Sequence, residues 1–319
     1  MRGKWSRGEI HVRDLHLEDT IFSLHQELVR GAYRHGQYTS FFVVDPKVRH
    51  IHKASVRDRV VHHAVFRTLY PMFDRSFIFD SYSCRVGKGA HRAIRRLQVF
   101  LRKEGKNNTR IPYVLKCDIR RFFDSVDHSI LLKLLKRHIK DERTLSLLQA
   151  IIGSFAGQRG KGIPLGNVTS QLFANIYLNE LDVFMKHSLK APNYVRYCDD
   201  FVVVSHDKKQ LVGFISSINT FIDDRLRLEL HPSKVHVRKF SHGIDFLGYV
   251  LFPCHVVLRV RTKKRVLKKI AHMVEGQKAG VVKEPYVRSA IQSYLSTLNH
   301  CNACSLKRHI KEMQSGGRF

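Results

Sequence analysis

The chain has 319 residues, of which 43% are hydrophobic, so it is long enough for two or three substructures around a shared core. Lysine and arginine number 56 against 27 aspartates and glutamates, which gives a formal net charge of +29. This excess predicts a polyanionic partner. We expect nucleic acid and no membrane, because every apolar run is too short to span a bilayer and residues 1–9 lack the apolar core of a signal peptide.

Six cysteines are scattered along the chain without the spacing of a disulfide framework, which predicts a reducing, cytoplasmic location. Cys301 and Cys304 form a CxxC pair, with His300 and His309 nearby. A structural zinc site usually needs a second pair of this kind, and the sequence has none. We therefore favour two cysteines on the face of a C-terminal helix over a zinc site.

Taken in chain order, the first hundred residues predict three helices and one strand. Apolar periodicity indicates helices over residues 15–29, 57–69 and 90–102, and a strand over residues 41–44. Asp45-Pro46 closes the strand, Pro71 stops the second helix, and Gly105 ends the third.

The middle third predicts a strand, two helices and a hairpin. Residues 113–118 are typical of a short strand that ends on an acid, Asp118. Asp127 is placed to cap an amphipathic helix, and a second helical pattern covers residues 170–187. Residues 194–205 predict a hairpin, because two β-rich flanks surround a tip that contains two adjacent acids.

The last third predicts a helix over residues 208–225, strands over 235–240 and 244–251, and then a helical, basic region. No acid occurs between Asp245 and Glu275. The cations in this interval are Arg259, Arg261, Lys263, Lys264, Arg265, Lys268 and Lys269. A charge run is often a plain solvated face, but in a chain with this overall charge we favour contacts to a nucleic-acid backbone.

Acids stand at the ends of two predicted strands, Asp118 on one and Asp199-Asp200 on the other. A carboxylate in an apolar sheet is costly unless it is paired or binds a cation, although aspartate is also common in plain turns. Mg²⁺ prefers oxygen ligands and is usually held by one or two carboxylates together with substrate phosphates. Two such ions, about 4 Å apart, lower the barrier to in-line phosphoryl transfer.

Four motifs, in order, carry a family resemblance. Asp118 to Phe123 resembles the first palm motif of reverse transcriptases, and Tyr197 to Asp200 resembles their YxDD box. Residues 162–171 are similar to the loop and helix under the incoming nucleotide, and residues 246–249 to the primer-grip hairpin. Because all four occur at plausible spacing, the resemblance is specific, and it covers about residues 35–255.

The resemblance implies an α+β fold of the right-hand polymerase type, with fingers, an antiparallel palm sheet and a helical thumb. We expect fingers and palm in residues 1–255 and a basic helical thumb in residues 256–319. It further implies an RNA-directed DNA polymerase that uses deoxynucleoside triphosphates and two Mg²⁺ ions, with Mn²⁺ as a substitute. The implied metal-binding residues are Asp118, Ile119, Asp199 and Asp200.

Other residues match positions that contact substrate in this family. Phe123 matches the aromatic that presses on the sugar and excludes a 2′-hydroxyl, whereas Phe122 fits a core aromatic, because neighbouring strand residues face opposite ways. Gly166 would allow the backbone to approach a base or sugar closely. The resemblance also implies substrate contacts by Ile119, Leu165, Gln171, Arg49 and Arg59, primer-grip roles for Phe246, Leu247 and Gly248, and backbone contacts by Arg259, Arg261, Lys263, Lys264 and Lys268.

Two of these assignments have plain structural alternatives. Lys234 matches a catalytic lysine that protonates the departing pyrophosphate, and an exposed structural lysine explains it equally well. In Arg57-Asp58-Arg59, a surface ion pair competes with a triphosphate contact.

Many members of the family read Gln-Gly in the pocket loop and Ser-Pro at its end, whereas this chain has Leu165-Gly166 and Ser170-Gln171. With residues 57–63 and 80–89, this pattern resembles the reverse transcriptases of diversity-generating retroelements. The resemblance implies a bacterial or phage enzyme that copies a template-repeat RNA, holds the RNA–cDNA duplex, makes errors opposite adenine, and binds a basic accessory variability determinant protein. We hypothesise that Leu165 weakens checking of the nascent base pair, with simple packing as the alternative.

Two other interpretations remain open. One is a retron or group II-like reverse transcriptase used in phage defence, and the other is a non-catalytic RNA-binding protein on a polymerase scaffold. The intact acids favour an enzyme. Because no pattern of a ribonuclease H, integrase or HNH endonuclease follows, we expect RNA removal and cDNA integration to be done by other proteins.

Overall fold

The computed structural model describes residues 17–44, 47–155 and 160–314, and its chain passes back and forth between two units. The first unit combines Met1–Phe79, Asp118–Lys190 and Ser217–Pro232. The second combines Asp80–Cys117, Ala191–Ser216 and Ser233–Phe319. The predicted division at residues 255 and 256 stays a prediction.

The first unit is built from helices around α8 (Val168–Val183), which has buried residues on all sides and packs against α3 (Val56–Asp74) and α6 (His128–His138). As predicted, Asp127 caps α6, accepting hydrogen bonds from the backbone N–H groups of Ser129 and Ile130. The remaining elements of this unit are α2 (Leu17–Val29), α5 (Phe122–Ser125), α7 (Glu142–Gly153) and the π-helix η1 (Phe184–Ser188).

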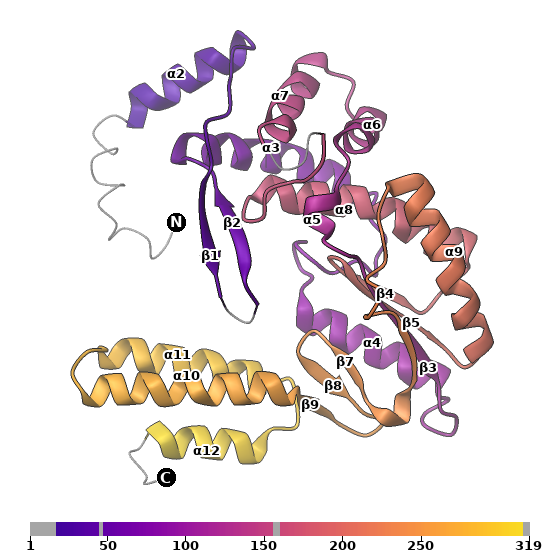
Figure 1. Cartoon of the computed structure of the whole chain (residues 1–319). Coiled ribbons are helices and arrows are strands. Elements are labelled where there is room, and N and C mark those ends of the chain that lie inside the picture. The colour runs from indigo at the N-terminus through magenta and orange to yellow at the C-terminus, as the bar shows by residue number, and fades with distance from the viewer. Residues whose placement is uncertain (1–16, 45–46, 156–159, 315–319) are drawn as a thin grey trace. The chain divides into compact units, whose positions relative to one another are not determined.

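The first unit also carries an antiparallel hairpin, β1 (Thr39–Val43) and β2 (Arg49–Lys53), which Figure 1 shows as a long two-stranded ribbon. All five residues of β1 are exposed. The predicted strand over residues 41–44 is thus present, whereas Asp45 and Pro46, which we expected to close it, lie outside the described residues.

The expectation that Pro71 stops the second helix is wrong, because α3 continues to Asp74. Proline removes one backbone donor and usually breaks a helix interior. Here Leu69 and Phe73, on either side of Pro71, are both buried, so their packing keeps the last turn helical. The third predicted helix does end as expected: α4 (Ala90–Glu104) is capped by Gly105.

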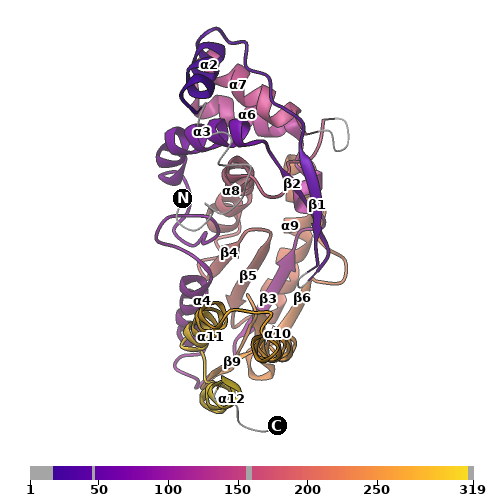
Figure 2. The ribbon, with the colours of Figure 1, turned by 90° about the vertical axis from the view of Figure 1, so that its left-hand side faces the viewer.

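The second unit contains a four-stranded sheet in the order β4-β5-β3-β6, with α4 packed on β4 and β5. Figure 2 shows α4 beside this sheet. The strands are β3 (Tyr113–Asp118), β4 (Tyr194–Tyr197), β5 (Asp200–Ser205) and β6 (His236–Lys239). The predicted strand over residues 113–118 and the hairpin over 194–205 are therefore confirmed. Helix α9 (Lys208–Leu226) follows β5, and its two halves fall in different units.

A smaller sheet and three helices complete the second unit. The sheet consists of β7 (Ile244–Phe246), β8 (Tyr249–Leu251) and β9 (Val256–Leu258), preceded by the 3-10 turn η2 (Phe240–His242). The helices are α10 (Val260–Lys278), α11 (Glu284–Leu298) and α12 (Cys304–Gln314), which lie side by side in Figures 1 and 2. One apolar core joins these elements to α4 and to the larger sheet. Residues 256–258 form a strand, so the predicted helical region begins at Val260.

Candidate active site

The two adjacent acids lie at the tip of the β4–β5 hairpin. Tyr197 pairs with Asp200 across the strands, so Cys198 and Asp199 form the two-residue turn. Cys198 has a φ of 58°. This lies in the left-handed region, which such turns require and which residues other than glycine rarely adopt. The pKa of the Cys198 thiol is raised to about 12, mainly by burial and to a lesser extent by the negative charge of Asp199. The thiol therefore stays neutral beside the acids.

Asp200 is paired with a lysine from the neighbouring strand. Lys116 Nζ on β3 lies 3.3 Å from Asp200 Oδ2 and also donates a hydrogen bond of 2.8 Å to the carbonyl of Asp245. The Asp200 side chain is 21% exposed and that of Lys116 is 15% exposed. In these half-buried surroundings the pair is screened less than a surface ion pair, so the Lys116 ammonium offsets part of the negative charge at the hairpin tip.

Asp118 is the last residue of β3 and is fixed through its main chain, whose carbonyl accepts a 2.8 Å hydrogen bond from His231 N–H. Ile119 forms a β-bridge with Leu230 and has a side chain that is 1% exposed, so only its main chain could reach a metal ion. Asp118 belongs to the first unit, and Asp199 belongs to the second. Their convergence on shared metal ions therefore stays a prediction.

Carboxylate oxygens are the donors that Mg²⁺ prefers, so the chemistry of these three acids suits the expected ions. Within residues 17–44, 47–155 and 160–314, no three His, Cys, Asp or Glu side chains are grouped as a ready-made metal site. A two-metal polymerase site does not require one, because substrate phosphates and waters supply part of the coordination. The expectation of two cysteines on one helix face is wrong for Cys301, which lies in the bend before α12, whereas Cys304 is the first residue of that helix.

The predicted nucleotide-pocket loop is bonded to two other elements of the first unit. Ile163 N–H donates to the carbonyl of Phe123 at 2.8 Å, and His52 N–H of β2 donates to the carbonyl of Leu165 at 3.0 Å. Gly166 has a φ of 122°, and a Cβ there would lie 3.0 Å from Ile51. Glycine is therefore required by both the backbone conformation and the close approach of β2. The loop thus joins Phe123, Leu165 and Gly166 in one local structure.

Phe122 and Phe123 differ as the sequence predicted, but for another reason. They lie in the short helix α5 and not in a strand, which corrects that expectation. Phe122 is 2% exposed and packs in the core, whereas Phe123 is half-buried. Leu165 is also half-buried, and Gln171 on α8 is exposed, so all three predicted pocket side chains keep some accessible surface.

The arginines before and within α3 have different surroundings. Arg57 pairs with Glu27 and with Asp58, 3.2 Å away, so the ion pair anticipated in this segment is formed by Arg57. Arg59 is half-buried, and its Nε is a buried donor without a hydrogen-bond partner in the described chain. Arg49 is exposed on β2. Both triphosphate contacts stay predictions.

Sequence reasoning missed a histidine network beside the pocket. His62 on α3 is 1% exposed; its Nε2 lies 3.0 Å from His35 Nε2, and its Nδ1 lies 2.5 Å from Thr169 Oγ1 on α8. Burial, helped by the nearby His35, lowers the pKa of His62 to about 4, so this histidine is neutral at pH 7. The only sequence signal was the His62-His63 doublet inside the predicted helix over residues 57–69.

The predicted primer-grip residues form the β7–β8 turn. Leu247 and Gly248 have φ values of 51° and 87°, which is the two-residue turn that hairpins favour, and Phe246 is 0% exposed. Leucine rarely adopts such a φ, so the turn is strained at that residue. Lys234 lies in the half-buried bend before β6, where its catalytic role stays a prediction.

The predicted backbone-binding cations divide into two groups. Arg259 is half-buried, pairs with Asp245, and precedes α10. On α10, Val266, Ile270 and Val274 face the core. The exposed cations of the helix include Arg261, Lys263, Lys264 and Lys268.

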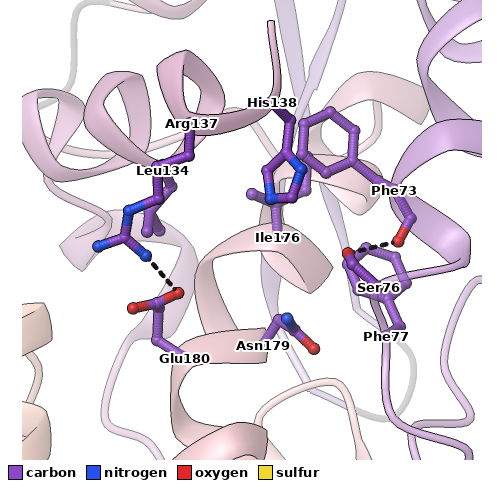
Figure 3. Close-up of a pocket in the computed structure, with 9 residues that line it drawn as sticks. All are labelled: Phe73, Ser76, Phe77, Leu134, Arg137, His138, Ile176, Asn179 and Glu180. Carbon is purple, nitrogen blue, oxygen red and sulfur yellow. Dashed lines mark hydrogen bonds and ion pairs between the residues drawn. The ribbon is translucent and has the colours of Figure 1, made fainter.

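A small pocket lies between α3, α6 and α8 in the first unit, and none of the predicted site residues lines it (Figure 3). Arg137 and Glu180 form a 2.8 Å ion pair at one side of it, and Phe73 packs edge-on against His138. Its volume of about 20 Å³ is far below that of a nucleotide site. No helix in the described parts of the chain is long and apolar enough to cross a membrane.

The chain is similar to several known proteins. It is 28% identical to YkfC of Escherichia coli over 269 residues, which cover 72% of this chain and 70% of YkfC. It is 22% identical to the group II intron-encoded protein LtrA of Lactococcus lactis, covering 73% of this chain and 49% of LtrA. Both of these relatives are bacterial proteins, and LtrA is encoded in a group II intron.

The fold is similar to that of telomerase from Candida albicans, solved in complex with a fragment of telomeric RNA. The TM-score is 0.54 at 13% identity, and the match covers 84% of this chain and 56% of that one. The model of the family "Reverse transcriptase (RNA-dependent DNA polymerase)" matches residues 44–251. These findings confirm the predicted α+β polymerase fold and the enzyme class, RNA-directed DNA polymerase, whose members generally depend on divalent metal ions. Because the match covers well over half of its length, the chain belongs to the reverse transcriptase family.

Proposed function

We propose that this chain copies RNA into DNA by two-metal nucleotidyl transfer, with Asp118, Asp199 and Asp200 as metal-binding residues and Mg²⁺ as the ion. The observation that carries the proposal is the 3.3 Å ion pair between Lys116 on β3 and Asp200 on β5. Alternate residues of a strand face the same way, so Asp118 emerges on the face of Lys116, about 7 Å further along β3. This supports the convergence of Asp118 with the tip of the β4–β5 hairpin.

When bound, the two ions activate the primer hydroxyl and neutralise the triphosphate. The chain's own residues have the task of positioning. Arg59, half-buried on α3, is the residue that holds a phosphate oxygen of the incoming deoxynucleotide in this proposal. Phe123, bonded through its main chain to the pocket loop, is suited to press on the sugar. Lys234 supplies the proton for the departing pyrophosphate.

Template RNA and the RNA–cDNA duplex bind through their phosphates. The exposed cations of α10 are suited to this contact, because neutralised phosphates release counterions. The β1–β2 ribbon offers Phe42 stacked on His50, with ring centroids 4.5 Å apart and planes 11° from parallel. Phe42 is 65% exposed, so this flat pair can take a nucleobase on its free side.

The proposal is tested by primer extension on an RNA template in Mg²⁺, comparing wild type with Asp199→Ala/Asp200→Ala. We expect extension by wild type and a loss of at least about a thousandfold in the variant, because several kcal/mol of charge stabilisation are removed. The matched control is Asp223→Ala/Asp224→Ala, an adjacent exposed acid pair on α9, which should extend normally. Equal extension by both double variants would refute the assignment of the acids.

We further propose that the enzyme is of the diversity-generating type, cytoplasmic, and active on a template-repeat RNA with a basic accessory protein. Leu165 supports this, because it is half-buried and stands where the family resemblance implies a glutamine amide. An aliphatic group cannot make the hydrogen bonds that check pair geometry. With cognate RNA and accessory protein, cDNA should carry errors mainly opposite adenine, and Leu165→Gln should reduce them.

The similarity to LtrA favours a second candidate, a group II-like or retron reverse transcriptase. The same fidelity assay separates the two. An error rate at adenine no higher than at the other template bases, with and without the accessory protein, would support the group II-like enzyme and reject the diversity-generating one.

A further inference from the structure

Arg196, two residues before the turn of the β4–β5 hairpin, is 0% exposed and is among the largest fully buried side chains of the described residues. A buried guanidinium is very costly unless acceptors compensate it. Its Nη1 donates to the carbonyl of Cys198 at 3.1 Å, and its Nη2 donates to Ser81 Oγ at 3.0 Å. The guanidinium therefore links the turn that carries the acids to the Ser81 hydroxyl.

The carbonyl that Arg196 holds belongs to the peptide unit that joins Cys198 to Asp199. Because a peptide unit is planar, fixing this oxygen also fixes the direction in which the Asp199 backbone leaves the turn. Cys198 is in the left-handed region, with a φ of 58°, which is unfavourable for any residue other than glycine. The hydrogen bond from Arg196 offsets that cost and stabilises one conformation of the turn.

Ser81 belongs to a segment that covers the edge of the sheet. β4 is an edge strand, and Arg196 N–H donates to the carbonyl of Asp80 at 3.0 Å, while Tyr82 N–H donates to the carbonyl of Arg196 at 3.0 Å. The segment is itself held, because Asp80 forms a 2.7 Å ion pair with Arg96 of α4. Residues 80–82 thus shield the edge and place the hydroxyl that receives Arg196.

We propose that Arg196, seated on Ser81, is a positioning residue that orients Asp199 for binding divalent metal ions. This inference rests on the proposed function and deepens it. It also assigns a task to the segment beginning at Asp80, which the sequence marked but the reaction does not use. Groups that orient metal ligands typically change metal affinity or activity by about 10- to 100-fold when they are altered.

The test uses the full chain with Arg196→Lys, Ser81→Ala and the matched control Arg102→Lys, an exposed arginine on α4. Ser81→Ala keeps Arg196 and its hydrogen bond to the Cys198 carbonyl but removes the hydroxyl that accepts the second hydrogen bond from Arg196. Two quantities are measured: the Mg²⁺ concentration for half-maximal extension, and Mn²⁺ affinity from the electron paramagnetic resonance of free Mn²⁺. We expect Arg196→Lys to raise the first and weaken the second by about 10- to 100-fold, and Ser81→Ala to do so by about tenfold.

A purely structural role would lower the melting temperature and leave the metal requirement unchanged. Folded Arg196→Lys and Ser81→Ala proteins with wild-type Mg²⁺ and Mn²⁺ dependence would therefore overturn the proposal. If Arg196→Lys does not fold, Ser81→Ala decides by itself. If wild type makes no DNA, the proposed function fails, but Mn²⁺ binding still tests the role of Arg196. Loss of Mn²⁺ binding in Asp199→Ala together with weaker binding in Ser81→Ala would support that role. Equal Mn²⁺ binding in all variants would reject it.

Discussion

Two of the hairpins that carry predicted site residues, β4–β5 and β1–β2, have opposite surroundings. The flanks of the acidic turn, β4 and β5, are buried almost throughout, and their edge is covered by residues 80–82. The β1–β2 ribbon is exposed along β1 and only half-buried along the second half of β2. An isolated two-stranded ribbon is marginally stable in water, so β1–β2 depends on its anchors, whereas β4–β5 is held by the core. Rigid burial suits the metal-binding acids, and exposure suits contact with a long ligand.

The largest expected difference between the hairpins is in folding stability. Phe201 on β5 is 0% exposed, and Phe42 on β1 is 65% exposed. Phe201→Ala should lower the free energy of unfolding by about 3–5 kcal/mol, because it leaves a cavity. Phe42→Ala should change it by no more than about 0.5 kcal/mol. Urea unfolding followed by circular dichroism measures both, and similar losses in the two variants would contradict the comparison.

A second test concerns an anchor of the exposed ribbon. His35, which contacts His62, stacks on Tyr38 just before β1, with ring centroids 4.7 Å apart. The pKa of His62 is lowered to about 4, whereas an unfolded histidine titrates near 6.5. The stability due to neutral His62 is therefore fully present above about pH 6.5 and is lost as the pH falls towards 4. At pH 5 the loss should be about 2 kcal/mol.

The variant His62→Asn isolates this contribution from the other histidines. Its free energy of unfolding should lie below that of wild type at pH 7, and the difference should shrink by about 2 kcal/mol at pH 5. Urea titrations at the two pH values measure this difference. Parallel losses in both proteins would assign the pH dependence to other groups.

A smaller effect is expected on binding. Phe42→Ala removes the ring that stacks on His50 and should weaken the binding of single-stranded RNA by about 1–3 kcal/mol. Val43→Ala, an exposed neighbour on the same strand, is the control and should bind as wild type does. Fluorescence anisotropy with a labelled RNA measures both affinities. Equal weakening in the two variants would assign the effect to the strand and not to the stack.

The sequence predicted the buried hairpin better than its support. Two β-rich flanks around Tyr197 to Asp200 were sufficient to predict β4, β5 and the acidic tip, because the residue types of a hairpin are a local signal. The partners of the tip were not predictable: Lys116 and Ser81 lie far from it in the sequence, and their contacts depend on the strand order. The burial of Arg196 was not predictable either, since an arginine in a strand is usually exposed.

Local signals also failed where packing overrides them. Pro71 predicted a helix end, but buried neighbours carry α3 past it. The π-helix η1 extends α8 from Phe184 to Ser188 within a stretch that the sequence indicated as a single helix. The strand β9 lies where the helical thumb was expected to begin, at residues 256–258, and its three apolar residues are too few to show a strand period.

The smallest expected effect concerns the salt dependence of duplex binding, which compares the half-buried Arg259 with the exposed lysines of α10. Each phosphate that a cation neutralises contributes about 0.9 to the slope of log affinity against log salt on a duplex. Lys263→Gln/Lys264→Gln/Lys268→Gln should therefore reduce that slope by about 2–3 and weaken binding most at low salt. Arg259→Gln should change the slope less, since Arg259 already pairs with Asp245. Filter binding to an RNA–DNA duplex at several salt concentrations gives both slopes. If Arg259→Gln reduces the slope as much as the triple variant does, the half-buried arginine grips the duplex, and exposure on α10 does not decide which cations bind phosphate.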